Sequence, residues 1–139
     1  MHIVPALNLG GNCREAIQLY EQAFNGKINC LITYAEANDP KYNPLLKEHQ
    51  KDHIYHSELV LGHQRFIMSA LVGMEFQTCY SNFLTVMCET KEEVQRAYET
   101  MKAGSKTISN GGHAIQLLPP CFVDRFGIRW GIMTEQTER

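Results

Sequence analysis

Two ionisable side chains in the middle of the chain have the spacing of a general acid–base pair. His56 and Glu58 stand two residues apart in a stretch, 53–61, that alternates polar and apolar residues, as a β-strand does. Such residues share one face of the strand and lie about 7 Å apart along it. A carboxylate this close can orient a histidine as a general base, so the pair is the best catalytic candidate. The sequence nevertheless favours a polar pair held by structural contacts or at a subunit interface.

Three histidines have a second spacing with possible chemistry. His49, His53 and His56 follow the i, i+4, i+7 spacing with which one face of a helix could bind a metal. The alternation that begins at His53 predicts a strand instead, and a strand puts His53 and His56 on opposite faces. The sequence therefore gives little support for a metal ion at these histidines.

The cysteines do not form a recognisable site. Their number is odd, they are widely spaced, and no Cys-x-x-Cys pair occurs, which argues against both a disulfide framework and a structural zinc site. A nucleophilic cysteine needs a nearby base and a lowered pKa, and the sequence shows neither. We interpret them as buried or half-buried thiols in a reducing compartment: Cys13, Cys30, Cys79, Cys88 and Cys121.

Composition is that of one globular unit of ordinary type. The 139 residues are 44% hydrophobic and 20% charged, with a net charge of −2, and a chain of this length can bury a sizeable core. The positive residues form no basic stripe, so a nucleic-acid partner is not expected. No apolar run is long enough to span a membrane, and the first residues lack the pattern of a signal peptide. We expect a cytoplasmic protein without a membrane partner.

The first 26 residues predict a strand, a turn and an amphipathic helix. Residues 3–9 alternate as a strand, and Gly10-Gly11 ends it. Asn12 with Glu15 three residues later predicts a capping box at the start of the helix. Gly26 is the expected C′ residue that ends it.

This layout recurs 78 residues later. Thr90 and Gly104 enclose a second helical stripe as Asn12 and Gly26 enclose the first, and Tyr98 matches Tyr20. Each helix follows one strand and precedes three more segments, so the sequence predicts a duplicated βαβββ unit. Each half is too small to bury its sheet alone, and the halves should pair to enclose something.

The remaining segments complete the two halves. A strand is predicted at 27–34, a long polar irregular stretch at 36–52, and a hairpin of strands 53–61 and 64–70 around Gly62-His63. A connector at 71–80 precedes a strand at 82–88. Asp124 should cap the Phe-Gly turn of the last hairpin through its side chain. The other predicted segments are 106–109, 113–117, the hairpin 124–133 and a frayed tail at 135–139.

A family resemblance rests on four stretches: PALNLGGNCREAIQLYEQAF (5–24), IYHSELVLG (54–62), NFLTVMCET (82–90) and DRFGIRWGIM (124–133). With them the chain resembles the PhnB-like proteins of the glyoxalase/bleomycin resistance/dioxygenase (vicinal oxygen chelate) superfamily. The resemblance implies an α+β fold in which two paired βαβββ modules, about 1–72 and 80–135 of a single domain 1–139, form curved sheets around a cleft. It also implies a homodimer.

The resemblance locates the metal site of the metal-dependent relatives. Two His and two Glu ligands, from the first and last strand of each module, would fall on Pro5, on Met68 or Ser69, on Phe83 and on Gly131. None of these is a strong ligand for a divalent ion. We therefore expect no cofactor, and a divalent metal has no support at the expected positions. This weakens lyase, isomerase and dioxygenase activities together, because each uses the metal to polarise vicinal oxygens.

A ligand cleft is expected at the centre of the paired sheets. Core packing is the alternative role for each apolar or aromatic residue there, including Phe66 and Tyr80. The residues expected to line the cleft are Pro5, Leu7, Met68, Phe83, Thr85 and Trp130.

Three functions follow from these observations. The first is a small-molecule-binding protein of the PhnB-like group. The second is an enzyme that uses His56 and Glu58, or a metal held in a non-standard way. The third is a dimeric interaction module without a ligand. Some proteins of the group carry names that imply ubiquinone methyl transfer, but no Gly-rich nucleotide-type loop follows a strand here, so the sequence does not support that chemistry.

Overall fold

The computed structural model describes residues 1–75, 81–82, 84–107 and 121–134. The chain divides into two compact units, Met1–Gln77 and Thr78–Arg139. Each unit is described by itself below. Phe83 and the predicted segment 113–117 lie outside the described residues, as do Tyr80, Cys79 and the tail.

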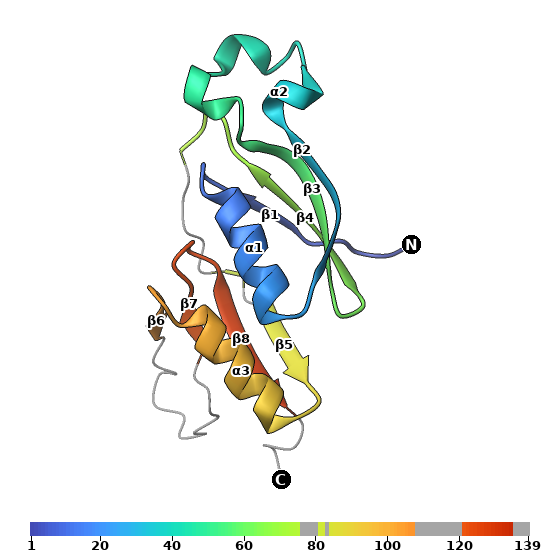
Figure 1. The fold of residues 1–139 in the computed structure, drawn as a ribbon, viewed down its shortest axis with the longest axis vertical. Helices are drawn as coiled ribbons and strands as arrows, with labels where there is room; N and C mark the ends of the chain where they lie inside the picture. The colour runs from blue at the N-terminus through green and yellow to red at the C-terminus, as the bar shows by residue number, and fades with distance from the viewer. Residues whose placement is uncertain (76–80, 83, 108–120, 135–139) are drawn as a thin grey trace. The chain divides into compact units, whose positions relative to one another are not determined.

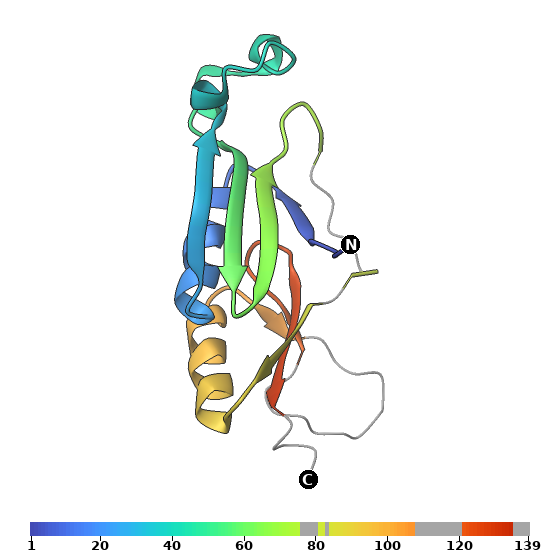
Figure 2. The ribbon, with the colours of Figure 1, turned by 90° about the vertical axis from the view of Figure 1, so that its right-hand side faces the viewer.

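The first unit is a four-stranded mixed sheet with one helix along a face (Figures 1 and 2). The strand order is β1-β4-β3-β2, in which β1 pairs with β4 in parallel and the other pairs are antiparallel. The hairpin of β3 and β4 turns at Gly62-His63, as predicted from the sequence. The elements of this sheet and its helix are β1 (Ala6–Leu9), α1 (Cys13–Ala23), β2 (Lys27–Thr33), β3 (Ile54–Leu61) and β4 (Gln64–Ala70).

The core of the first unit lies between α1 and the sheet. Ile17 and Tyr20 are buried on one stripe of the helix, while the outward-facing Gln18 is exposed, as expected for an amphipathic helix on a sheet. On the strands, alternate residues such as Leu59 and Met68 are fully buried. The alternation is what divides the sheet into a packed face and an opposite face.

The second unit repeats the same topology. Its strand order is β5-β8-β7-β6, with β5 parallel to β8. Helix α3 begins and ends 78 residues after α1, the offset at which the sequence repeats. The predicted α+β fold of two βαβββ units is therefore confirmed. The elements are β5 (Leu84–Cys88), α3 (Lys91–Met101), β6 (Lys106–Thr107), β7 (Phe122–Val123) and β8 (Arg129–Thr134).

The helix ends correct two of the sequence predictions. Asn12 is the N-cap of α1, but its side chain makes no capping hydrogen bond, so the predicted capping box is wrong. Thr90 does cap α3, because its hydroxyl accepts the Glu93 N–H at 3.2 Å.

At the other end of α1 the left-handed residue is Asn25, with φ of 50°, and Gly26 follows it. The Gly26 N–H donates to the Glu21 carbonyl at 2.8 Å, so Gly26 is the C″ residue of a Schellman-type end.

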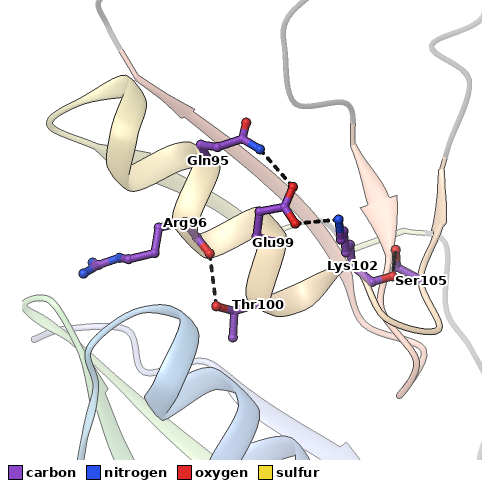
Figure 3. A network of polar contacts seen from close by, with 6 residues as sticks. All are labelled: Gln95, Arg96, Glu99, Thr100, Lys102 and Ser105. Atoms are coloured by element: carbon purple, nitrogen blue, oxygen red, sulfur yellow. Dashed lines mark hydrogen bonds and ion pairs between the residues drawn. The ribbon is translucent and has the colours of Figure 1, made fainter.

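The outer face of α3 carries a short polar network (Figure 3). Gln95 donates to the Glu99 carboxylate at 2.9 Å, and the same carboxylate pairs with the Lys102 ammonium. The hydrogen bond that Lys102 donates to Glu99 raises the pKa of the Lys102 ammonium above its usual value. All of these side chains are solvent-exposed, so the network keeps the helix surface polar and contributes little to stability.

The long polar stretch between β2 and β3 has more structure than its sequence predicts. It contains helix α2 (Tyr34–Ala37) and two short 3-10 helices, η1 (Asn43–Leu45) and η2 (Glu48–Gln50). The rings of Tyr34, Tyr42 and Tyr55 pack edge to face, with centroids 5.3 to 6.0 Å apart. The Tyr34 hydroxyl donates to the Ala70 carbonyl at 2.7 Å, and Tyr55 donates to Asp39 at 2.9 Å. These contacts hold the stretch on the end of the first sheet.

Among the described residues, no helix is both long enough and apolar enough to cross a membrane.

Candidate functional site

The face of the first sheet opposite α1 carries most of the polar side chains of the strands. Ser57 and Met68 are cross-strand partners and both are fully buried toward α1. Their chain neighbours therefore point to the other side, where burial is only partial. We call this side the open face, and the residues that define it are Ala6, Asn8, Lys27, Cys30, Ile32, His56, Glu58, Val60, Arg65, Ile67 and Ser69.

The register arranges these side chains in rows across the strands. One row crosses all four strands, and it consists of Ala6, Ile67, Glu58 and Cys30. The row toward the β3–β4 turn consists of Lys27, Val60 and Arg65. On the other side, Asn8 pairs with Ser69 and Ile32 pairs with His56. Successive rows are separated by two residues, or about 7 Å along the strand.

Glu58 is the centre of the charged groups on the open face. One of its carboxylate oxygens lies 3.6 Å from Nε2 of His56, and the other lies 3.9 Å from a guanidinium nitrogen of Arg65. The side chains are 28% (Glu58), 35% (His56) and 45% (Arg65) exposed. Both separations exceed a hydrogen bond, so these contacts leave the three side chains room for other partners. The structure thus brings together the two residues of the predicted acid–base pair.

Two further polar groups come from the strands on the β1 side. The Ser69 hydroxyl donates to the Asn8 side-chain oxygen at 3.1 Å, and this bond is solvent-exposed. Ser69 lies next to Met68 in the chain. On the buried face, the Ser57 hydroxyl donates to the Met68 carbonyl at 2.7 Å. The open face therefore combines one carboxylate, one imidazole, one guanidinium, one ammonium (Lys27) and an amide–hydroxyl pair.

Sequence reasoning found His56 and Glu58 but missed Arg65 and Asn8, and it named Ser69 only as a possible position of a metal ligand. The alternation of residues 64–70 puts Arg65, Ile67 and Ser69 on one face, and that signal was present in the sequence. Only the cross-strand register shows that this is also the face of His56 and Glu58. Asn8 was hidden in the same way, because its neighbours come from a strand some sixty residues later.

The residues predicted to line a cleft lie in several environments. Met68 and Trp130 are 0% and 1% exposed and belong to the cores of their own units. Leu7 pairs with Met68, and Thr85 is exposed opposite Gly131. The half-buried Pro5 uses its carbonyl to accept the Ile67 N–H at 2.9 Å. The contribution of these residues to a ligand cleft stays a prediction.

The first and last strands of each unit do not offer the donor set of a divalent-metal site. The open face has Ala6 and Asn8 on β1 and Ile67 and Ser69 on β4, and Pro5 and Met68 supply no imidazole or carboxylate either. In the second unit Thr85 pairs with Gly131. In the described part of the chain, no three His, Cys, Asp or Glu side chains lie close enough together to hold a metal ion. The side chains present do not fit the four-ligand metal of the metal-dependent relatives.

Two of the histidines considered as metal ligands lie beside each other, away from His56. The rings of His49 and His53 meet edge to face with centroids 5.9 Å apart, and the His53 ring lies against the backbone of Gly11. His56 is on β3, on the open face. The three histidines are therefore not arranged as one chelating set.

Comparison with protein families decides the relationship of the chain. The sequence profile described as 3-demethylubiquinone-9 3-methyltransferase matches residues 1–133. The chain belongs to this PhnB-like family. No curated protein sequence matches it significantly. Family membership agrees with the resemblance seen in the four sequence stretches, and it holds over nearly the whole length.

Solved structures of PhnB-like and related proteins share the fold. Protein PA1353 from Pseudomonas aeruginosa is 25% identical with a TM-score of 0.77, and the match covers 97% of this chain and 98% of that one. The putative 3-demethylubiquinone-9 3-methyltransferase, PhnB protein, from Bacillus cereus is 20% identical with a TM-score of 0.74, over 96% and 99% of the two chains. FosX, a fosfomycin resistance protein from Listeria monocytogenes, is 12% identical with a TM-score of 0.64, over 96% and 90%. The fold of this PhnB-like chain is thus that of the glyoxalase/bleomycin resistance superfamily.

Proposed function

We propose that this PhnB-like protein binds a small organic molecule on the open face of its first sheet and does so without the four-ligand metal site. The observation that carries the proposal is the position of Glu58, with its carboxylate between His56 and Arg65 on the sheet face opposite α1. The three side chains offer both donors and acceptors and are half-exposed, so a ligand can reach them.

The surroundings of this charged group have the composition of a ligand site. Ile67 and Cys30 lie in the same row as Glu58, and Val60 and Ile32 lie in the two adjacent rows. Small-molecule sites combine an apolar surface with a few placed polar groups that fix orientation. A purely structural ion pair would gain little at this exposure, because solvent screens it.

A second candidate function is catalysis by the same pair. His56 Nε2 faces Glu58 at 3.6 Å, which leaves Nδ1 of the imidazole to take a proton from a bound substrate. Glu58 would be the positioning carboxylate, and Arg65 would offset its charge. The distance between His56 and Glu58 is what favours this candidate.

Methyl transfer, the activity in the family description, has less support in this chain. No Gly-x-Gly-x-x-Gly loop follows a strand in its sequence, and the open face has a central carboxylate with apolar residues on either side. FosX has been solved with Mn(II) and a dihydroxypropylphosphonic acid. The positions at which the family resemblance expects metal ligands hold no histidine, aspartate or glutamate in this sequence, which supports binding by side chains alone.

A ligand screen tests the proposal. Thermal-shift measurements against a panel of metabolites and antibiotics, followed by calorimetric titration, should yield ligands with measurable affinity. Glu58→Gln should change the affinity for each ligand by about tenfold or more, because it removes the charge that lies between His56 and Arg65. Glu92→Gln removes an exposed carboxylate of α3 and is the matched control. Equal binding by wild type and Glu58→Gln would contradict the proposal, as would a panel without a single ligand.

Turnover separates the two candidates. If a ligand is converted, His56→Ala and Glu58→Gln should abolish the conversion, and unchanged rates would remove both from the catalytic role. Metal analysis of protein purified without chelators tests the remaining part of the proposal. One tightly held ion per chain would overturn binding by side chains alone.

A further inference from the structure

One end of the open face concentrates positive charge. Lys27 on β2 and Arg65 on β4 are both paired with Val60 of β3, so the two cations flank one apolar residue in a single row. Both side chains are exposed. Among the residues that define the open face, these two are positive and only Glu58 is negative. With His56 neutral the face carries a balance of +1, although the whole chain carries −2.

Glu58 does not neutralise this row. Its carboxylate is shared between Arg65 and His56, and the distance of 3.9 Å to Arg65 is longer than a charge-assisted hydrogen bond. The guanidinium presents five N–H groups in a planar fork, so a contact of this kind leaves donors for a second acid. A proton on His56 would add a positive charge next to Glu58, and the net charge of the open face would stay positive.

The surface next to the cationic row is apolar. Val60 lies between the two cations, and Ile67 and Cys30 stand in the next row on either side of Glu58. Ile32 follows one row further. Val60, Cys30 and Ile32 therefore form an apolar strip beside Glu58 and His56, which extends about 14 Å from the cationic row, the length of two row spacings.

We infer that the ligand of the open face is an anion with an apolar body, whose acidic group lies between Lys27 and Arg65 and whose body lies along Val60, Cys30 and Ile32. This inference rests on the proposed binding function. Two cations on the strands that flank β3 can reach across Val60 to contact one carboxylate or phosphonate together, and Arg65 can hold it in bidentate fashion. Charge complementarity would select the acid over its neutral analogue, while the apolar strip supplies area to bury.

Matched acids and amides test the inference. Octanoate and cinnamate are compared with octanamide and cinnamamide by calorimetric titration and by protection of Cys30 from iodoacetamide, because Cys30 lies beside Glu58 on the open face. The acids should bind at least tenfold more tightly than the amides and should slow alkylation of Cys30. Their affinity should fall as salt is raised from about 20 to about 200 mM, since the cations are exposed.

Charge-removing variants locate the acidic group. The double variant Lys27→Gln with Arg65→Gln should bring the affinity for the acids down to that for the amides, a loss of at least tenfold. Lys51→Gln with Lys102→Gln removes two exposed lysines elsewhere and should change nothing. Both changes of the first pair are at exposed positions, so the fold should be retained, and circular dichroism checks this.

The outcomes separate the inference from the proposed function. If the amides bind as tightly as the acids and Glu58→Gln changes the affinity for both, the inference is wrong and the binding site stands. The inference is also wrong if the acids keep their advantage in the double variant. If neither class binds or protects Cys30, and the wider panel gives no ligand, the proposed function itself fails.

Discussion

The indole N–H of Trp130 donates to one carboxylate oxygen of Asp124 at 2.8 Å, while the other oxygen of Asp124 accepts the backbone N–H groups of Phe126 and Ile128 at 2.9 and 3.0 Å. Asp124 is 4% exposed and Trp130 is 1% exposed. One side chain therefore closes the turn between β7 and β8 and satisfies the polar atom of the largest core residue of the second unit. The sequence prediction that Asp124 caps this turn is confirmed.

Asp124→Ala should destabilise the protein by about 3 kcal/mol or more, because the buried indole and two backbone groups lose their acceptor. Chemical denaturation followed by tryptophan fluorescence measures the free energy of unfolding. Asp52→Ala removes an exposed aspartate and should cost less than about 0.5 kcal/mol. A similar small cost for both variants would show that the hydrogen bonds of Asp124 are not important to the fold.

The two helix N-caps should respond differently to alanine. Thr90→Ala removes the hydroxyl that accepts the Glu93 N–H and should cost about 1 kcal/mol. Asn12→Ala should cost much less, because the Asn12 side chain makes no capping bond. Urea denaturation of the two variants in parallel makes the comparison. Equal losses would mean that Asn12 caps α1 in solution.

Gly26→Ala should destabilise the first unit by about 1–3 kcal/mol, the cost of overpacking. A Cβ at Gly26 would lie 2.6 Å from a Leu61 methyl group and 3.2 Å from two backbone atoms, which cannot move aside as a side chain can. At Gly10 the same atom would meet only the Asn12 side chain, at 3.7 Å. Thermal unfolding should thus show a lower midpoint for Gly26→Ala than for Gly10→Ala, and the reverse order would refute this packing.

Cys13 should make the stability of the protein fall at alkaline pH. Burial raises the pKa of its thiol from 9.0 to about 12, so above pH 9 the unfolded chain loses a proton that the folded chain keeps. The stability linked to this thiol is complete below pH 9 and is lost as the pH rises from about 9 to about 12. In urea titrations at several pH values, Cys13→Ala should therefore lose less stability over this range than the wild type.

A reactivity measurement checks the same thiol independently. At a pH of about 9.5, iodoacetamide should modify Cys13 of the folded protein at least tenfold more slowly than Cys13 of the urea-unfolded protein, because the thiolate is the nucleophile. Peptide mass spectrometry resolves Cys13 from the other cysteines. Equal rates in the two states would show that the thiol is not buried.

The fold could be predicted from the sequence because the same pattern of strand, capped helix and further strands occurs twice. The helix positions repeat at an offset of 78, and this repeat survives in the structure at both ends of α1 and α3. The caps were less predictable, since residue type does not fix the backbone. Thr90 has the extended conformation that capping needs, with φ −130° and ψ 159°, whereas Asn12 has φ −90° and ψ 15°.

Only the site residues that share one strand, β3, could be predicted from the sequence. Alternation along β3 placed His56 and Glu58 on a common face, and the structure agrees. Arg65 joins them through the pairing of β3 with β4, and that register depends on the turn and on packing against α1. Alternation also could not tell that Met68 and Trp130 are fully buried in their units, because apolar strand residues suit either a core or a ligand surface.

The parallel pairing of β1 with β4 has a kinetic consequence. Ala6 pairs with Ile67, so 61 positions separate partners on these strands, whereas only Gly62 and His63 separate the strands of the β3–β4 hairpin. Closing the long loop costs more chain entropy than closing the short one, and contacts of high sequence separation slow folding. Strand β1 should therefore join last, and until it does β4 is an unprotected edge on which a second polypeptide can add a strand.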